Sequence, residues 1–403
     1  MVKKLSARHW FLIVITFCVF TIYAFYIDSF GPNATVMMNF YQIDSSQQGF
    51  ILTVQSIGGL AASVFLALMG ERFNKIYVVG AGTCIMGAAS VCIGFAPSYT
   101  VLILLVAAAG IGFTCVDIMV NGVIADTYPD RKNTLLPITH AFYGVGAMIA
   151  PLFVAGTVNP QVYSSFSVPF LWIGIAALII FLLYILSGRF VMKDTPYAHM
   201  EEMKKCACEN PAEIFKTGGA WLLLVICFFQ FAFQFGISTW LPTYCIEARG
   251  MAFEEAGLLL SGFFGGALVM RFLGPAILRR ISAANLFSWF IVAAAVCMAL
   301  ALSVPGIPVM IVLIIAAGFF QGSNAVALVI MCCAVYPNRT ASASAVTVFA
   351  VNIATMTVPL LIGEIAKHVG FQLPLYLVCA LMVIPFVLTR YLIKQHKSLQ
   401  TIG

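Results

Sequence analysis

The chain has 403 residues, of which 62% are hydrophobic and only 9% are charged, and its mean hydropathy is +1.01. Soluble domains are about 45–50% apolar and about 25% charged, so a globular core could not bury this much apolar surface. The composition therefore excludes a soluble enzyme, a nucleic-acid binder and a disordered scaffold, and it indicates a protein embedded in a membrane.

Apolar segments of about 20 residues or more, the length needed to cross a bilayer, follow one another along the whole chain. Their apolar runs are continuous rather than alternating, which favours helices over barrel strands. We therefore predict an all-α membrane protein with 12 transmembrane helices. The predicted spans cover residues 10–36, 48–69, 76–96, 99–124, 135–158, 168–191, 219–246, 255–278, 284–304, 307–335, 340–366 and 372–393.

The net charge of +6 comes from Lys and Arg residues that gather on one side of these spans. Lys3, Lys4 and Arg8 precede the first span, and most other basic residues lie in loops that follow even-numbered spans. Because cytoplasmic loops carry an excess of Lys and Arg, both termini are predicted to be cytoplasmic. The short loops are typical of a protein of the bacterial inner membrane.

Residues at a constant separation indicate an internal repeat. Tyr128-Pro129 recurs as Tyr336-Pro337, 208 residues later, and several glycines and prolines repeat with the same offset. The polar segment 193–218 separates six spans from six, which divides the chain into an N-terminal half (1–192), a cytoplasmic loop (193–218) and a C-terminal half (219–403). A parallel repeat of six-span halves predicts a substrate site between the halves near the midplane.

The 12 cysteines are scattered, mostly within apolar segments, which predicts buried apolar fillers rather than a disulfide framework. Cys206 and Cys208 share the polar loop, but no second ligand pair is nearby, so we predict no metal site. The sequence has neither a phosphate-binding loop nor a zinc-helix motif. We therefore expect no enzyme activity, no cofactor and no ATP-driven pump.

The first two spans carry few polar residues, of which two are candidates for function. A charge at membrane depth costs about 2.5–3.5 kcal/mol by insertion scales and therefore marks a pathway or a packed interior. Asp28 in the first span is either a proton or substrate contact or a solvated carboxylate at the outer rim. Gln55 in the second span either lines the cavity or joins helices.

The fourth and fifth spans carry the most specific polar pattern. Asp117 and Asn121 are four residues apart and so share one helix face. Asp117 is interpreted as a proton carrier or an acceptor for sugar hydroxyls, the alternative being an interior carboxylate bonded to a neighbouring helix. His140 in the fifth span could titrate near neutral pH, donate to a substrate hydroxyl, or pack as an ordinary hydrogen-bonding residue.

Amides and aromatics in the later spans suit a neutral, polyhydroxylated solute. Gln230 and Gln234 lie four residues apart in the seventh span, followed by Trp240, whose ring could stack on a sugar. The alternative is amide contacts between helices and an aromatic at the membrane interface. The same two interpretations apply to three residues of spans ten and eleven: Gln321, Asn324 and Asn352. Near the end of span eleven, we expect Glu364 and Lys367 to form an ion pair at the outer rim that contributes little to stability.

With these residues in view, the chain resembles the major facilitator superfamily over nearly its whole length. The segment after the second span, Gly70-Glu71-Arg72-Phe73-Asn74-Lys75, is similar to the conserved loop of that superfamily, with Glu71 in the aspartate position and Asn74 in a glycine position. The resemblance implies a major facilitator fold. It also implies that an acidic and basic cluster in this loop locks the cytoplasmic side during transport. The implied gating residues are Gly70, Glu71, Arg72 and Lys75.

Spans four and five resemble the fucose–galactose–hexose symporter branch and its glucose-transporter-like relatives. The similarity rests on about 40 residues, from Asp117 through His140 to Pro151. In the seventh span the branch commonly has an acidic residue six positions before the tryptophan, where this chain has Gln234. This departure shifts the predicted proton role to Asp28 or Asp117.

We therefore predict a secondary active transporter that works by alternating access and proton symport of a small neutral solute, a sugar in the first place. Its partners would be the solute, protons and membrane lipid, without nucleic acid, and we expect a monomer. The alternative in the same fold is proton-coupled efflux of drugs or amphipathic metabolites, for which 34 Phe and 17 Met would provide an adaptable cavity. A non-transporting nutrient sensor is a third, disfavoured hypothesis.

Overall fold

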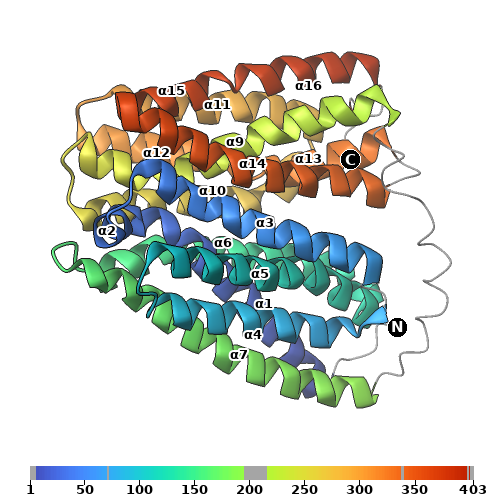
Figure 1. Ribbon diagram of the computed structural model, residues 1–403. Coiled ribbons are helices and arrows are strands. Elements are labelled where there is room, and N and C mark those ends of the chain that lie inside the picture. The colour runs from blue at the N-terminus through green and yellow to red at the C-terminus, as the bar shows by residue number, and fades with distance from the viewer. Residues whose placement is uncertain (1–5, 70–71, 195–215, 337–339, 397–398, 400–403) are drawn as a thin grey trace. The chain divides into compact units, whose positions relative to one another are not determined.

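The computed structural model describes residues 6–69, 72–194, 216–336, 340–396 and 399, and these residues form helices without any strand (Figure 1). Twelve of the helical segments are long and apolar enough to cross a membrane. Their bounds agree with the predicted spans to within a few residues at most ends. By internal contacts the chain divides into two units, Met1–Gln42 with Val54–Cys208, and Ile43–Thr53 with Glu209–Gly403. The first turns of helix α3 therefore belong to the second unit.

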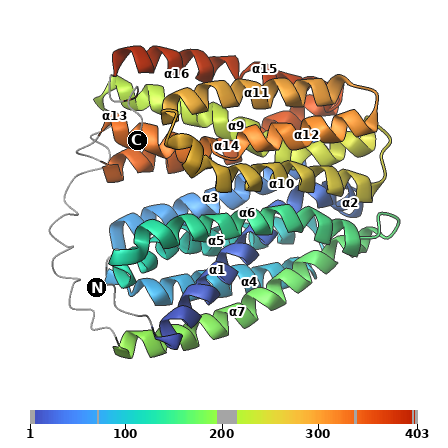
Figure 2. The ribbon, with the colours of Figure 1, turned by 180° about the vertical axis from the view of Figure 1, so that it is seen from behind.

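The first unit is an all-helical bundle in which α4 packs against α5 and α7, while α1 packs against α6 and α7 (Figures 1 and 2). Helix starts carry local signals, such as Asn74, whose side chain accepts a hydrogen bond from the Ile76 backbone N–H and so caps α4. The elements are α1 (Ala7–Asp28), α2 (Phe30–Tyr41), α3 (Ser45–Met69), α4 (Lys75–Ile93), α5 (Tyr99–Thr127), η2 (Pro129–Arg131), α6 (Lys132–Thr157), η3 (Tyr163–Phe166) and α7 (Ser167–Asp194).

The second unit repeats this arrangement, since α9 packs against α14 and α16, and α11 packs against α12 and α16 (Figures 1 and 2). Its helix α12 ends at Gln321, and α13 begins only after Gly322 and Ser323. The elements are α9 (Gly218–Glu247), α10 (Phe253–Leu278), α11 (Ala283–Ser303), α12 (Ile307–Gln321), α13 (Asn324–Val335), α14 (Thr340–Val369), α15 (Gln372–Ala380) and α16 (Val383–Gln395).

The helix bounds confirm the internal repeat. Helices α10, α11, α12 and α14 each begin 208 residues after α3, α4, α5 and α6, respectively. The backbone of Gln42, before α3, is left-handed with φ 53°, and Gly250, before α10 and 208 positions later, has φ 63°. A left-handed residue therefore precedes the corresponding helices α3 and α10. Only the second copy has the glycine that this conformation favours.

Contacts at glycines repeat as well. A Cβ added to Gly110 on α5 would overlap the backbone oxygen of Gln55 on α3. Likewise, a Cβ on Gly318 of α12 would overlap the backbone oxygen of Phe263 on α10. Both residues of the second pair lie 208 positions after their counterparts. Small residues thus let paired helices approach closely at the same place in each half, as in other membrane helix interfaces.

The Tyr-Pro motif that revealed the repeat has a structural role in both units. The Tyr128 hydroxyl lies 3.3 Å from Nδ1 of His9, near the start of α1. The Tyr336 hydroxyl lies 2.5 Å from the hydroxyl of Thr217, just before α9. His9 and Thr217 are also separated by 208 positions, so each tyrosine ties the end of one helix to the beginning of the first helix of its own half.

We expect Gly318→Ala to destabilise the protein by about 1–3 kcal/mol, because the added methyl group would have to displace the backbone of α10. The measurement is the thermal unfolding midpoint of the purified protein in detergent. Gly306→Ala is the control, since no described atom beyond its two chain neighbours lies within 4 Å of the position of its Cβ. Equal midpoints for the two variants would show that α10 and α12 do not need this close approach.

Candidate functional site

Helices α1, α5 and α6 bring the predicted polar residues of the first unit together. Asp117 and Asn121 lie one turn apart on α5, and the Asn121 amide donates to the backbone oxygen of Asp117 at 2.7 Å. Oδ1 of Asn121 lies 3.2 Å from Nε2 of His140 on α6. Asn121 therefore connects α5 to α6 within one turn of Asp117.

Two tyrosines that the sequence interpretation missed complete this cluster. The Tyr143 hydroxyl donates to Oδ2 of Asp28 at 3.3 Å. The Tyr23 hydroxyl donates to the carboxylate of Asp117, and the centroids of the two tyrosine rings are 5.5 Å apart. Helix periodicity offered a signal for Tyr143, which lies three residues after His140 and so shares its face of α6.

Aromatic packing fixes the orientation of these groups. The ring of Tyr23 stacks on Phe113 of α5 at 4.4 Å with an interplanar angle of 6°. Phe20 of α1 meets the ring of His140 edge-on at 5.2 Å. Aromatic pairs of this kind contribute about 0.5–1.5 kcal/mol each beyond burial. The position of the Tyr23 hydroxyl is therefore set by α5 as well as by α1.

The two carboxylates differ in their exposure. Asp28 is only 7% exposed and lies inside the helix packing rather than at a solvated rim. Asp117 is partly exposed, and His140 is exposed. Within the first unit, Asp117 is therefore the less buried of the two carboxylates.

In the second unit, three amide side chains meet at the break between α12 and α13. Nδ2 of Asn324 lies 3.2 Å from Oε1 of Gln321 and 3.4 Å from Oε1 of Gln230 on α9. Among the described residues, Nε2 of both glutamines, Oδ1 of Asn324 and the Ser323 hydroxyl are buried without a hydrogen-bond partner. Each unpaired buried group costs about 1–3 kcal/mol. The cluster therefore holds both donors and acceptors that have no hydrogen-bond partner in the described structure.

Two other predicted substrate contacts already bond to backbone atoms. The indole N–H of Trp240 donates to the backbone oxygen of Pro359 at 3.0 Å, and its ring packs against Phe371. The Asn352 amide donates to the backbone oxygen of Val348 at 3.1 Å. The contact of Trp240 joins α9 to α14, whereas that of Asn352 lies within α14. A substrate role for these two side chains stays a prediction.

Gln55 and Gln234 lie outside both clusters of contacts. Gln55 on α3 is buried, and its Oε1 has no hydrogen-bond partner within the described part of the chain. Gln234 is partly exposed and lies one turn after Gln230 on α9. A substrate role for these two amides stays a prediction.

A groove of about 680 Å³ between α3, α4 and α5 is lined by apolar side chains such as Phe65, Tyr77 and Ile85. None of the candidate polar residues of the two clusters lines it. Its chemistry fits lipid chains, so we do not assign the polar solute to it.

The predicted gating loop is described only in part. Gly70 and Glu71 lie outside the described residues, and Arg72 is exposed. Nζ of Lys75, at the start of α4, lies 2.9 Å from Oδ2 of Asp126 on α5, and the two side chains are 12% and 20% exposed. Lys75 thus ties α4 to α5 inside the first unit, and the gating role stays a prediction.

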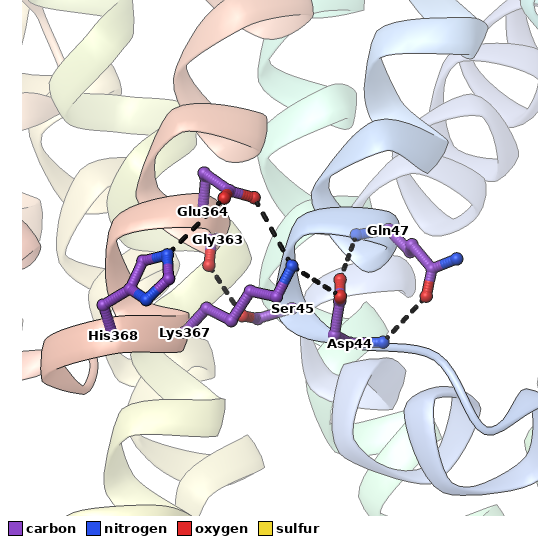
Figure 3. Close-up of polar contacts among 7 residues, drawn as sticks. All are labelled: Asp44, Ser45, Gln47, Gly363, Glu364, Lys367 and His368. Carbon is purple, nitrogen blue, oxygen red and sulfur yellow. Dashed lines mark hydrogen bonds and ion pairs between the residues drawn. The ribbon is translucent and has the colours of Figure 1, made fainter.

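The rim pair predicted at the end of α14 is part of a larger cluster at the start of α3 (Figure 3). Nζ of Lys367 lies 2.8 Å from Oδ2 of Asp44 and 3.8 Å from Glu364, so its shorter contact is to a residue that the sequence did not suggest. Beside this pair, the Ser45 hydroxyl donates to the backbone oxygen of Gly363 at 2.6 Å. These contacts attach the first turn of α3 to α14.

Asp44 serves two purposes in this cluster. Its Oδ1 accepts the backbone N–H of Gln47 at 2.9 Å, while Oε1 of Gln47 accepts the backbone N–H of Asp44 at 3.1 Å, which forms a capping box at the start of α3 (Figure 3). The hydrogen bond to Lys367, followed by that to Gln47, lowers the pKa of the Asp44 carboxyl. The pair therefore stabilises the fold above the unfolded pKa of about 3.9 and loses this contribution as pH falls through the lower folded value.

We expect Asp44→Asn to lower the free energy of unfolding at pH 7 by less than about 1 kcal/mol, because the pair is exposed and Asn caps a helix as well as Asp does. The difference from the wild type should vanish at low pH, where Asp44 is protonated. Chemical unfolding at several pH values measures this, with the exposed Asp130→Asn as control. A difference that persists at low pH would assign the effect to the cap rather than to the charge.

Within the described residues, twelve apolar helices in two repeated six-helix halves define a multi-pass integral membrane protein. The sequence model described as Major Facilitator Superfamily matches residues 12–304 and 250–401. The chain belongs to this superfamily of transporters, as its sequence pattern predicted.

Two relatives are similar over part of their length. "Uncharacterized MFS-type transporter YfkL" of Bacillus subtilis (strain 168) is 21% identical over 254 residues, which are 62% of each chain. "Probable sulfoacetate transporter SauU" of Cupriavidus necator (strain ATCC 17699) is 24% identical over 290 residues, 66% of this chain and 65% of that relative. The chain thus spans slightly less than two thirds of both relatives.

Solved structures share the fold across nearly the whole chain. A bacterial homologue of the human lysosomal transporter Spinster, in an inward-facing and occupied conformation, has a TM-score of 0.80 at 13% identity and covers 99% of this chain and 100% of its own. A D-xylose-proton symporter has a TM-score of 0.74 at 14% identity, with 96% and 97% covered. The nucleoside transporter NupG has a TM-score of 0.74 at 12% identity, with 96% and 100% covered. These identities support the fold alone, and the resemblance to the hexose symporter branch stays a prediction.

Proposed function

We propose that this protein is a proton-coupled secondary transporter that moves a small neutral solute, a sugar in the first place, by alternating access. We further propose that it lies in a bacterial inner membrane with both termini in the cytoplasm and that it acts as a monomer. Its basic cytoplasmic loops would interact with lipid headgroups. The observation that carries the proposal is the separation of two kinds of polar site. The first unit holds carboxylates that can bind a proton, and the second holds uncharged amides with unpaired donors and acceptors.

Protonation would work through the energy of the buried charge. An ionised carboxylate in a low-dielectric interior is costly unless it is hydrogen-bonded, and proton binding removes that charge. In this mechanism Asp117 or Asp28 takes a proton and thereby lowers the energy of the closed, dehydrated state. His140 and Asn121, which bond to each other beside Asp117, would contact the proton carrier or the solute.

The amide cluster would contact the solute directly. Gln230, Gln321 and Asn324 together offer two unpaired amide donors and one unpaired acceptor, and the hydroxyl of Ser323 adds a group that can do either. A sugar hydroxyl donates one hydrogen bond and accepts others, so it matches this mixture, which neither a purely accepting nor a purely donating group would do.

A second candidate solute is a small organic anion. One observation favours it besides the sulfoacetate relative. Ala267 and Gly274 of α10 face Gly322 and Ser323 at the α12–α13 break, and Arg271 lies one turn from each of them on the same helix. A guanidinium near the amide cluster would suit a carboxylate or sulfonate better than a hydroxyl.

The experiment that tests the proposal is uptake by proteoliposomes with an imposed pH gradient. The solute panel contains neutral hexoses, deoxyhexoses and polyols, together with small carboxylates and sulfonates. We expect accumulation of a neutral sugar that a protonophore abolishes. Accumulation of an anion alone would select the second candidate, and export of lipophilic compounds with no uptake would select efflux.

For the transported solute, we expect Asp117→Asn to abolish uphill accumulation while exchange of labelled for unlabelled solute persists, because the variant keeps a hydrogen-bonding group but cannot change its charge. The two activities are measured in the same liposomes. Uphill accumulation at the wild-type level would remove Asp117 from the coupling role. Loss of both activities, with a normal elution profile, would assign Asp117 to solute binding.

We expect Gln321→Ala to raise the KM for the solute several-fold and up to about tenfold, since one hydrogen bond to a neutral group contributes about 0.5–1.5 kcal/mol. The substitution also removes the shorter of the two hydrogen bonds that Asn324 donates. Initial uptake rates over a range of solute concentrations provide the measurement. Thr243→Val is the control, because the Thr243 hydroxyl on α9 is also buried and unpaired but lies outside the amide cluster. Similar KM values in both variants would make the amides structural.

A further inference from the structure

The residues around Asp28 and Asp117 form a cluster of titratable groups in the first unit. Tyr23 interacts electrostatically with Asp117, Tyr143 and Asp28, which come from the three helices α5, α6 and α1. His140 on α6 is a further titratable residue of the cluster, and it bonds to Asn121. The two carboxylates are therefore connected through two phenols rather than isolated from each other.

The geometry gives each carboxylate its own tyrosine. The Tyr143 hydroxyl donates to Asp28, and the Tyr23 hydroxyl donates to Asp117. A hydrogen bond donated to a carboxylate favours its ionised form. The phenol is also able to turn and accept a hydrogen bond once the carboxylate has been protonated. The tyrosine rings contact each other with centroids 5.5 Å apart, and Tyr23 is only 5% exposed.

Two carboxylates in one low-dielectric cluster do not titrate independently. The negative charge on one carboxylate favours proton binding by the other. Once a single proton is bound, the repulsion between the two charges is gone and a second proton binds less readily. The hydrogen bonds from Tyr23 and Tyr143 determine how the proton is divided between the two positions.

We propose that Tyr23 and Tyr143 are positioning residues that join Asp28 and Asp117 into one proton-binding unit, which takes up a single proton between its two carboxylates. The inference rests on the proposed function, because it specifies the proton site of that transporter. The proton comes from water at the partly exposed Asp117 and returns to water there. While it is bound, one carboxyl is neutral and the other keeps its charge and its tyrosine donor.

Tyrosine-to-phenylalanine variants test this directly, because they keep the contacts of the aromatic rings and remove only the hydroxyls. Tyr23→Phe and Tyr143→Phe are compared with Tyr26→Phe. Tyr26 lies on α1 as well, and its hydroxyl is buried without a hydrogen-bond partner in the described structure. The control therefore removes the same atom as both variants, and from the same helix as Tyr23→Phe, at a hydroxyl that bonds to no carboxylate in the described structure.

The readout is the carboxylic-acid C=O band in infrared spectra of the purified protein as pH is changed, which needs no solute. Asp28→Asn and Asp117→Asn identify the band. In the wild type we expect a single band that corresponds to one proton. In Tyr23→Phe and Tyr143→Phe its pH midpoint should rise by about one unit, which is the effect of losing one hydrogen bond to a charged group. Tyr26→Phe should match the wild type.

Midpoints that coincide in the wild type and in both tyrosine variants would overturn the proposal, as would two independent carboxyl bands. The outcome is separable from the proposed function. A band that moves as expected in a protein without gradient-driven uptake would keep the proton-binding unit and reject symport. Gradient-driven uptake with unmoved midpoints would keep symport and reject the role of the tyrosines.

Discussion

The cost of burying a polar group inside a membrane protein is the constraint that organises this structure. A lipid environment offers no water to satisfy such a group, so each one is either bonded within the protein or available to a ligand. Asp28 and Asp117 meet this requirement through Tyr143 and Tyr23, respectively. The amides of the second unit meet it only in part, since they keep unpaired atoms at the α12–α13 break.

The repeat shows which positions are structural and which are specialised. Glycine contacts between paired helices, the Tyr-Pro hydrogen bonds and the helix starts recur 208 residues apart, so they belong to the shared scaffold. The polar residues do not recur. Ala325 stands 208 positions after Asp117, and Val116 stands 208 positions before Asn324. The two units thus share the same helix-packing contacts but differ in their buried polar side chains.

Sequence alone predicted the helices and the repeat because apolar length and a constant offset are properties of the chain itself. It also placed Asp117 and Asn121 on one face, since helix periodicity determines that relation. Sequence alone did not identify the residues that tertiary packing brings into contact with the predicted site residues. Tyr23 and Tyr143 look like ordinary apolar-face aromatics in the sequence, and nothing near Lys367 indicated that its shorter ion pair would be to Asp44. The break before Asn324 was hidden because Gly322 and Ser323 are common inside membrane helices.

The division of labour between the units also bears on how coupling and specificity could evolve separately. A substitution among the amides alters uncharged hydrogen-bonding groups and changes no charge, whereas a substitution at Asp28 or Asp117 removes a carboxylate beside a tyrosine hydroxyl. Because the shared contacts at Gly110 and Gly318 lie on the scaffold and not in either cluster, each site can change without disturbing helix packing in the other unit. Under the proposed function, a different solute would therefore require changes near Gln230, Gln321 and Asn324, while the proposed proton-binding groups of the first unit would stay as they are.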